Sequence, residues 1–219
     1  MNTTEQLVRI PAGTAVIEGL LTIPARAEGL VLFAHGSGSS RHSPRNNFVA
    51  RILNEKKLGT LLMDLLTPDE DTNYETRFDI KLLTQRLIAA TIWVENHPLT
   101  QSLPIGYFGA STGAAAALQA AAASGISVSA VVSRGGRPDL AGNDLARVQA
   151  PVLLIVGGHD FGVIELNEKA FAQLQSTKEL VIVPLATHLF DEPGTLEHAA
   201  RLASEWFEKY LSLKELSYP

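Results

Sequence analysis

The sequence contains no cysteine among its 219 residues. A disulfide framework, a thiolate metal site and a cysteine nucleophile are therefore excluded, so any covalent catalysis must use another side chain. Basic residues are also few, with 18 Lys and Arg against 23 Asp and Glu and a formal net charge of -5. Nucleic acids and anionic membranes bind clustered basic residues, so neither is an expected partner, and a small-molecule substrate is favoured.

Long apolar runs are missing as well. A membrane-spanning helix needs roughly 18 to 20 apolar residues, and even the alanine-rich stretch 114–123 is short and contains Gln119. The first eleven residues include Glu5 and Arg9 and lack the apolar core of a signal peptide, which predicts a cytoplasmic protein. The hydrophobic fraction of 46% is ordinary for a folded chain. We expect one domain over residues 1–219, because a single core can grow to roughly 250 residues.

Short β-branched or leucine-rich runs alternate with longer segments of helical period. This alternation is typical of an α/β fold with a mainly parallel sheet covered by helices. We expect about eight strands, near 7–10, 16–23, 30–34, 60–64, 105–108, 128–133, 152–156 and 180–183. Helices are expected near 47–57, 76–96, 112–124, 164–175 and 195–211.

Two of these segments carry finer signals. In the last helix, apolar residues recur at three- and four-residue steps and should form a stripe on the sheet: Leu196, Ala199, Ala200, Ala203, Trp206, Phe207 and Tyr210. Thr76 and Asp79 resemble a capping pair at the start of the helix near 76–96. The acidic segment 69–75 is interpreted as a solvated loop.

The pentapeptide Gly109-Ala110-Ser111-Thr112-Gly113 directly follows an apolar strand and directly precedes an alanine-rich helix. G-x-S-x-G in this context is the pattern of a sharp strand-to-helix turn that exposes the serine hydroxyl above the sheet. The flanking glycines allow strand and helix to approach closely. The pentapeptide alone is a weak pattern, and its position between strand and helix makes Ser111 the candidate nucleophile.

A serine hydroxyl is unreactive at neutral pH unless a base accepts its proton. His188 lies just beyond the last expected strand, where a loop can return to the top of the sheet, and it is the predicted base. His97, beside Pro98, and His198, within the final helix, are expected to be solvated or capping residues. His42 precedes the serine, which does not fit the chain order of hydrolases, and we keep it as a candidate substrate contact.

The acid that orients the histidine should follow a strand beyond the serine. The strand near 152–156 leads into the sequence GGHD at 157–160, whose glycines permit a turn that aims Asp160 inward. Asp160 completes the order serine, aspartate, histidine. Asp139 and Asp144 are the alternatives, and Asp160 could instead cap the helix that follows it.

The negative charge of a tetrahedral intermediate requires hydrogen-bond donors, and two backbone amides suffice. One should be that of Thr112, and the other should come from the sequence HGSG at 35–38, where Ser37 is favoured and Gly36 is second. This turn lacks both the G-x-G-x-x-G spacing and the Lys-Ser/Thr ending of a P-loop, so nucleotide binding is not expected. His35 is interpreted as a structural hydrogen bonder, and no spacing of histidines and carboxylates indicates a metal site.

Four arginines follow the third and sixth expected strands: Arg41, Arg45, Arg134 and Arg137. Substrates of parallel sheets bind at the carboxyl ends of the strands, so these arginines are candidates for holding an anionic substrate group, with Arg41 and Arg137 chosen first. The alternative is that they pair with Asp139, Asp144 or the acidic stretch 69–71, as surface arginines commonly do.

The HGSG turn, the GASTG elbow, the GGHD turn and the sequence THLF at 187–190 together resemble the α/β-hydrolase superfamily, and specifically its compact dienelactone-hydrolase-like branch. The resemblance covers nearly the whole chain and implies an eight-stranded, mainly parallel sheet, the triad named above and an acyl-enzyme mechanism without a cofactor. Dienelactone hydrolase itself uses cysteine where this chain has Ser111, so lactone specificity is not implied. The short interval 133–151 leaves no space for the large helical lid of many lipases, which predicts an open, shallow pocket.

The sequence therefore predicts a serine carboxylic ester hydrolase that acts on small or short-acyl esters. A thioesterase, a peptidase or an acyltransferase would use the same site, because the triad specifies acyl transfer but not the leaving group. A non-catalytic scaffold with the hydrolase fold is the alternative from another class, and the intact triad argues against it.

Overall fold

The central strands of the chain are buried along their whole length. In the computed structural model, which describes residues 3–212, this holds for β3 (Gly29–Ala34), β4 (Leu58–Met63), β5 (Ile105–Ala110), β6 (Ala130–Arg134) and β7 (Val152–Gly157). Parallel strands covered on both faces are near-continuous apolar runs. These segments therefore lack the alternation of a half-exposed strand.

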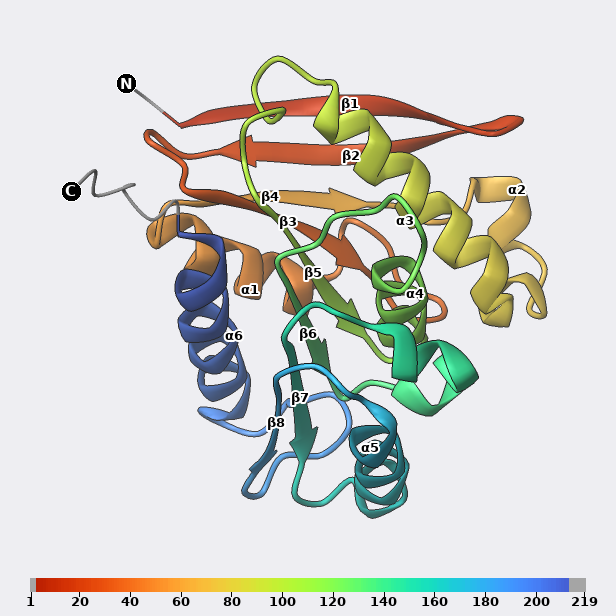
Figure 1. Cartoon of the computed structure of the whole chain (residues 1–219), viewed down its shortest axis with the longest axis vertical. Helices are drawn as coiled ribbons and strands as arrows, with labels where there is room; N and C mark the ends of the chain where they lie inside the picture. The colour runs from red at the N-terminus through yellow and green to blue at the C-terminus, as the bar shows by residue number, and fades with distance from the viewer. Residues whose placement is uncertain (1–2, 213–219) are drawn as a thin grey trace.

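All strands join one sheet in the order β1-β2-β4-β3-β5-β6-β7-β8 (Figure 1). β1 (Thr4–Ala12) and β2 (Ala15–Ile23) form an antiparallel hairpin, and β2 also pairs antiparallel with β4. The remaining neighbours are parallel, out to β8 (Lys178–Val183) at the far edge. The predicted α/β-hydrolase fold is confirmed, and the carboxyl ends of the parallel strands meet at one edge of the sheet.

Helices cover both faces of this sheet (Figure 1). α1 (Pro44–Glu55) and α6 (Thr195–Leu211) pack on one face, and α3 (Ile80–Glu95), α4 (Thr112–Ala121) and α5 (Phe161–Gln173) pack on the other. The predicted apolar stripe of α6 is confirmed, with Ala203, Trp206 and Phe207 buried against the sheet. None of the helices within residues 3–212 is both long enough and apolar enough to span a bilayer.

Two local predictions between β4 and α3 were wrong. The expected loop 69–75 begins inside a one-turn helix, α2 (Pro68–Asp71), because Thr67 and Glu70 cap it reciprocally through side chain and backbone. The expected capping pair at Thr76 is instead a 3-10 turn, η1 (Thr76–Phe78). Asp79 itself caps α3, since its carboxylate accepts from the backbone amide three residues later at 3.0 Å.

The connection from β6 to β7 is short, as predicted. It contains a 3-10 segment, η2 (Pro138–Arg147), with a non-helical backbone at Gly142. Ala141 and Leu145 of this segment are buried in the core next to α4. The segment is thus packed onto the body of the molecule, and the described chain has no large helical insertion after the sixth strand.

Candidate active site

Ser111 lies in the sharp turn between β5 and α4. Its backbone has φ 51° and ψ -126°, a conformation that residues with a side chain rarely adopt. Two glycines allow the close approach of chain segments that this turn requires. A Cβ on Gly113 would stand 2.1 Å from the carbonyl oxygen of Ala34, and a Cβ on Gly109 would stand 2.5 Å from the Cα of Ala114. The turn therefore has the strained geometry that its sequence pattern predicts.

His188 and Asp160 come from the loops after β8 and β7 and meet at the same edge of the sheet. The Nδ1 atom of His188 lies 2.7 Å from Oδ2 of Asp160. A carboxylate can only accept, so Nδ1 carries the proton and Nε2 is left with its lone pair. Asp160 stands at the N-cap position of α5, but its side chain makes no capping hydrogen bond. Its carboxylate serves the histidine instead.

The loop that carries His188 is held by a carboxylate that sequence reasoning did not single out. Glu192 accepts from the hydroxyl of Thr187 at 2.6 Å and from the amide of Thr187 at 3.0 Å. These two bonds, the hydroxyl bond first, hold the pKa of Glu192 below its usual value. Phe190, on the other side of His188, is buried although its φ is 59°. The position of the imidazole is thus determined by a constrained loop.

A cavity of about 230 Å³ opens at Ser111. Ser111 and His188 share its wall with Gly36 and Ser37 from the turn after β3. The rest of the wall comes from the chain around the start of α1, the ends of β5 and β6 and the His188 loop: Ser39, Ser43, Arg45, Asn46, Ala110, Arg134, Gly135 and Leu189. The elements that supply this wall are brought together only by the sheet topology.

The amides expected to stabilise an oxyanion lie beside the nucleophile. The Ser37 N–H donates to Oγ1 of Thr112 at 3.1 Å, so these two residues are in direct contact. A Cβ on Gly36 would stand 2.8 Å from the Cβ of Ser111, which places this turn against the nucleophile. Thr112 opens α4, and the first amides of a helix have no partner within the helix. The backbone amides of Gly36, Ser37 and Thr112 thus lie close to Ser111, and that of Ser37 is bonded to the hydroxyl of Thr112.

His35 lies behind this turn and matches the structural role expected of it. Its Nε2 accepts from the amide of Leu65 at 3.0 Å, and its Nδ1 lies 2.9 Å from the carbonyl oxygen of Gly36. Burial lowers its pKa below the usual 6.5. A neutral imidazole with Nδ1 protonated satisfies both bonds, so His35 ties the turn at 35–38 to the segment after β4.

Arg41 and His42, predicted as substrate contacts, are absent from the wall of the cavity at Ser111. Arg41 forms ion pairs with Asp64 and, at 2.7 Å, with Glu18. His42 is exposed in the segment before α1, where its backbone amide donates to Ser40 at 3.2 Å. The guanidinium of Arg41 is therefore engaged by two carboxylates on the β2 and β4 side of the sheet.

Arg137, the third predicted contact, is also absent from this wall. It forms a bidentate pair with Asp139 at 2.8 and 2.9 Å, which is the ion pairing considered as the alternative. The other two arginines of the same loops, Arg45 and Arg134, do line the cavity. The available sequence signal was the position of Arg134, a charged residue that ends a strand of three apolar residues and a serine.

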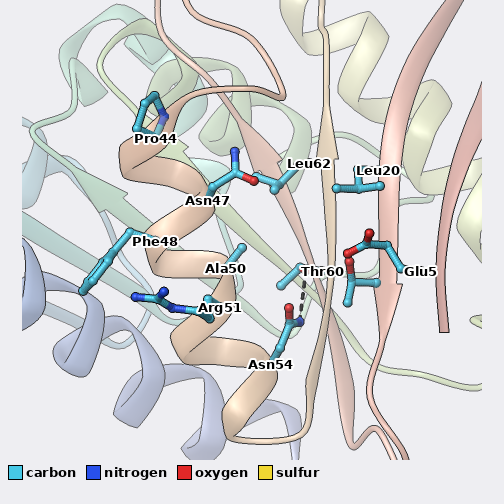
Figure 2. A pocket seen from close by; sticks show the side chains of 11 residues that line it. Glu5, Leu20, Pro44, Asn47, Phe48, Ala50, Arg51, Asn54, Thr60 and Leu62 are labelled. Carbon is cyan, nitrogen blue, oxygen red and sulfur yellow. Dashed lines mark hydrogen bonds between the residues drawn. The ribbon is translucent and has the colours of Figure 1, made fainter. Parts of the chain in front are cut away.

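A larger hollow, of about 470 Å³, lies between α1 and the strands β2 and β4 (Figure 2). Polar side chains including Glu5, Asn47 and Arg51 line it, and Asn54 donates to the hydroxyl of Thr60 there at 3.1 Å. Its lining contains neither serine nor histidine, so it offers no nucleophile next to a base. The chemistry of the residues, rather than the size of the hollow, therefore locates the candidate active site at Ser111.

Comparison with known proteins identifies the family of the chain. Residues 68–215 match the family model described as the dienelactone hydrolase family. The chain belongs to this family. A solved dienelactone hydrolase from Anabaena variabilis ATCC 29413 is 55% identical, covers 96% of this chain and 100% of its own, and superposes with a TM-score of 0.94. Est1E from Butyrivibrio proteoclasticus has the same fold at 17% identity and a TM-score of 0.77, over 93% of this chain and 98% of its own.

Two curated relatives come from Mycobacterium tuberculosis, strains CDC 1551 / Oshkosh and ATCC 25618 / H37Rv. Both are 56% identical over 207 residues, which is 94% of this chain. Both bear the provisional name phosphoribosyl transferase. The match covers 47% of their length, so the chain spans about half of these relatives. The name of these relatives applies to the whole proteins, and this chain resembles only one segment of them.

Proposed function

We propose that the chain hydrolyses small or short-acyl carboxylic esters, with Ser111 as nucleophile, His188 as general base and Asp160 as the acid that orients the base. One observation carries the proposal: the imidazole that bonds Asp160 at 2.7 Å lines the same cavity as a serine held at φ 51°. Membership of the dienelactone hydrolase family supports it.

Acylation begins when Oγ of Ser111 attacks the carbonyl carbon of the ester and its proton passes to Nε2 of His188. The oxyanion of the tetrahedral intermediate accepts hydrogen bonds from the amide of Thr112 and from that of Ser37, which exchanges its bond to Oγ1 of Thr112 for the oxyanion. Each donor is worth about 3 to 4 kcal/mol of barrier. The carbon–oxygen bond of the leaving group then breaks. The alcohol departs with the proton from Nε2, and the acyl group stays on Ser111.

Deacylation repeats these steps with water as the nucleophile. Water attacks the acyl carbon and gives a proton to Nε2 of His188. The bond between the acyl carbon and Oγ breaks, Ser111 regains a proton from the imidazolium, and the carboxylic acid leaves. Asp160 stabilises the imidazolium in acylation and in deacylation. It also keeps a proton on Nδ1, so that Nε2 is the nitrogen that accepts and returns the transferred proton.

The size of the cavity favours a short acyl group. Its volume of about 230 Å³ lies below the roughly 300 to 1,000 Å³ that is usual for pockets holding drug-sized ligands. Thioester hydrolysis, peptide hydrolysis and acyl transfer use the same groups and remain alternatives, because the triad does not select the leaving group. The name of the mycobacterial relatives offers phosphoribosyl transfer for those longer proteins, whereas the groups at Ser111 suit attack on an acyl carbon.

A fluorophosphonate probe and nitrophenyl acetate test the proposal. We expect the probe to label Ser111, and we expect Ser111→Ala and His188→Ala to lower kcat on the order of 10⁴-fold or more, because nucleophile and base act as a unit. Asp160→Asn should lower kcat less. Ser102→Ala, which removes an exposed serine outside the wall of the cavity, is the matched control and should keep both labelling and turnover.

The proposal fails if the Ser111→Ala protein, shown to be folded by circular dichroism, still turns over the ester. It fails equally if the folded natural chain neither reacts with the probe nor hydrolyses any ester of a graded panel. The second result would favour a scaffold that has the hydrolase fold without its activity.

A further inference from the structure

Arg134 is a buried cation that has no acidic partner among residues 3–212. It ends β6, paired in register with Ala110, the residue before the nucleophile. Only 6% of the residue is exposed. Its Nε has no hydrogen-bond partner, and one terminal nitrogen reaches only the carbonyl oxygen of Leu189, at 3.5 Å. The guanidinium sits 5.5 Å from the ring centre of Phe190, which stabilises the charge only in part.

A buried charge without a partner is unfavourable, and proteins normally pair it. Burial lowers the pKa of Arg134 to about 10, with the nearby charge of Arg45 acting in the same direction and Asp191 acting against it. The side chain is still protonated at neutral pH. The fold therefore holds a desolvated positive charge next to the nucleophile at some cost to stability.

Arg45 adds a second positive charge to the same cavity wall. It contacts Asp191 at 3.3 Å, but both side chains are partly exposed, so this pair is weak and easily exchanged for another anion. The wall contains no aspartate or glutamate. Ser43, which accepts from an amide of the first turn of α1, keeps its hydroxyl proton as a further donor in the wall.

We propose that Arg134 and Arg45 form an anion subsite beside Ser111 that selects esters carrying a carboxylate or a phosphate group near the scissile bond. A guanidinium presents two parallel N–H donors, which match the paired oxygens of either group. An anion held there would satisfy Arg134 and neutralise the positive charge of the wall. The selection of substrates rests on the proposed esterase function, whereas anion binding by itself does not.

The competing role for Arg134 is structural, since its contacts with Phe190 and Leu189 touch the loop that carries His188. Kinetics with three nitrophenyl esters of similar size separate the two roles: the hemisuccinate, the phosphonopropionate and the neutral pentanoate. The quantity compared is the ratio of KM for each anionic ester to KM for the neutral ester. A structural role changes kcat for all three esters and leaves this ratio constant.

Arg45 lies in the first turn of α1, so its variants alter no residue of the His188 loop. Asp191 belongs to that loop, so kcat for the neutral ester is followed in its variant as a check on the position of His188. We expect Arg45→Gln to raise the KM ratio about 5- to 10-fold and Asp191→Asn, which frees Arg45, to lower it about 2- to 3-fold. Arg134→Met should raise the ratio at least 10-fold, and Arg134→Lys should recover part of the loss. Arg51→Gln, an arginine of α1 that lies outside this wall, is the matched control and should leave the ratio unchanged.

The two anionic esters also identify the preferred anion. The hemisuccinate presents a carboxylate and the phosphonopropionate presents a phosphonate in place of phosphate, so the ester with the lower KM carries the preferred group. The inference is overturned if the folded natural chain hydrolyses the neutral ester at least as well as both anionic esters. It is also overturned if Arg45→Gln and Asp191→Asn leave the KM ratio constant.

Binding to the Ser111→Ala protein separates this inference from the esterase proposal, because that protein needs no turnover. Monomethyl succinate and inorganic phosphate are titrated by calorimetry. We expect binding of at least one of them, weakened at least 5-fold by adding Arg45→Gln and by raising the ionic strength. Binding without any ester hydrolysis by the natural chain would retain the anion subsite and reject the esterase. Hydrolysis of esters without binding of either anion would do the reverse.

Discussion

The strained backbone of Ser111 predicts that replacing the nucleophile by glycine stabilises the fold. At φ 51° and ψ -126°, a residue with a Cβ is unfavourable by about 1 to 3 kcal/mol. Glycine adopts this conformation without a Cβ clash, but its greater freedom in the unfolded chain opposes folding by about 0.5 to 1 kcal/mol. The free energy of unfolding should therefore be higher for Ser111→Gly than for Ser111→Ala, by about 0.5 to 2 kcal/mol.

Alanine is the correct reference because it removes the hydroxyl and keeps the Cβ that causes the strain. Urea denaturation measures the difference in unfolding free energy directly. In a thermal scan it should appear as a Tm that is about 1 to 8 °C higher, because 1 kcal/mol shifts Tm by about 2 to 4 °C in a chain of this length.

Ser39 supplies the matched control, since it lies in a nearby turn and is not among the described residues with positive φ. There the order should reverse, with Ser39→Gly less stable than Ser39→Ala. The reasoning is refuted if glycine is the less stable choice at both positions, because Ser111 would then store no strain that a glycine can release.

Two further predictions concern substrate size and pH. Esters with acyl chains of about two to four carbons should be hydrolysed faster than long-chain esters, because no large insertion within residues 3–212 covers an extended apolar groove. A preference for nitrophenyl palmitate over nitrophenyl butyrate would contradict this. Because burial holds the pKa of His35 below 6.5, His35 of the unfolded chain takes up its proton at a higher pH than His35 of the folded chain. The free energy of unfolding should therefore fall as pH decreases from 7 to 5, with His35 contributing up to about 1.4 kcal/mol per pH unit. His35→Gln, whose amide oxygen can accept from Leu65, should reduce this slope in urea denaturation, and an unchanged slope would exclude His35 as its source.

Much of the architecture was predictable because the local periodicity of apolar residues indicates which segments form strands and helices. Each buried strand is a short apolar run, and the stripe of α6 recurs at helical spacing, so the element type follows from side chains that are close in sequence. Element ends were less certain. α1 begins at Pro44, three residues before the predicted start, and Asp79 caps α3. Such ends depend on single hydrogen bonds to one side chain, which periodicity does not record.

The sequence by itself determined the candidate nucleophile, because the strain at Ser111 arises within five consecutive residues whose glycines are all visible in the chain. Tertiary structure alone decided which of the four arginines reach the cavity. Arg41 meets Asp64, 23 positions away, whereas Arg134 is placed beside Ala110 by the register between β5 and β6. The pairing of a charge depends on distances in space between segments that are far apart in the chain. Arg41 follows a strand and Arg134 ends one, and only the folded sheet distinguishes the paired arginine from the buried one.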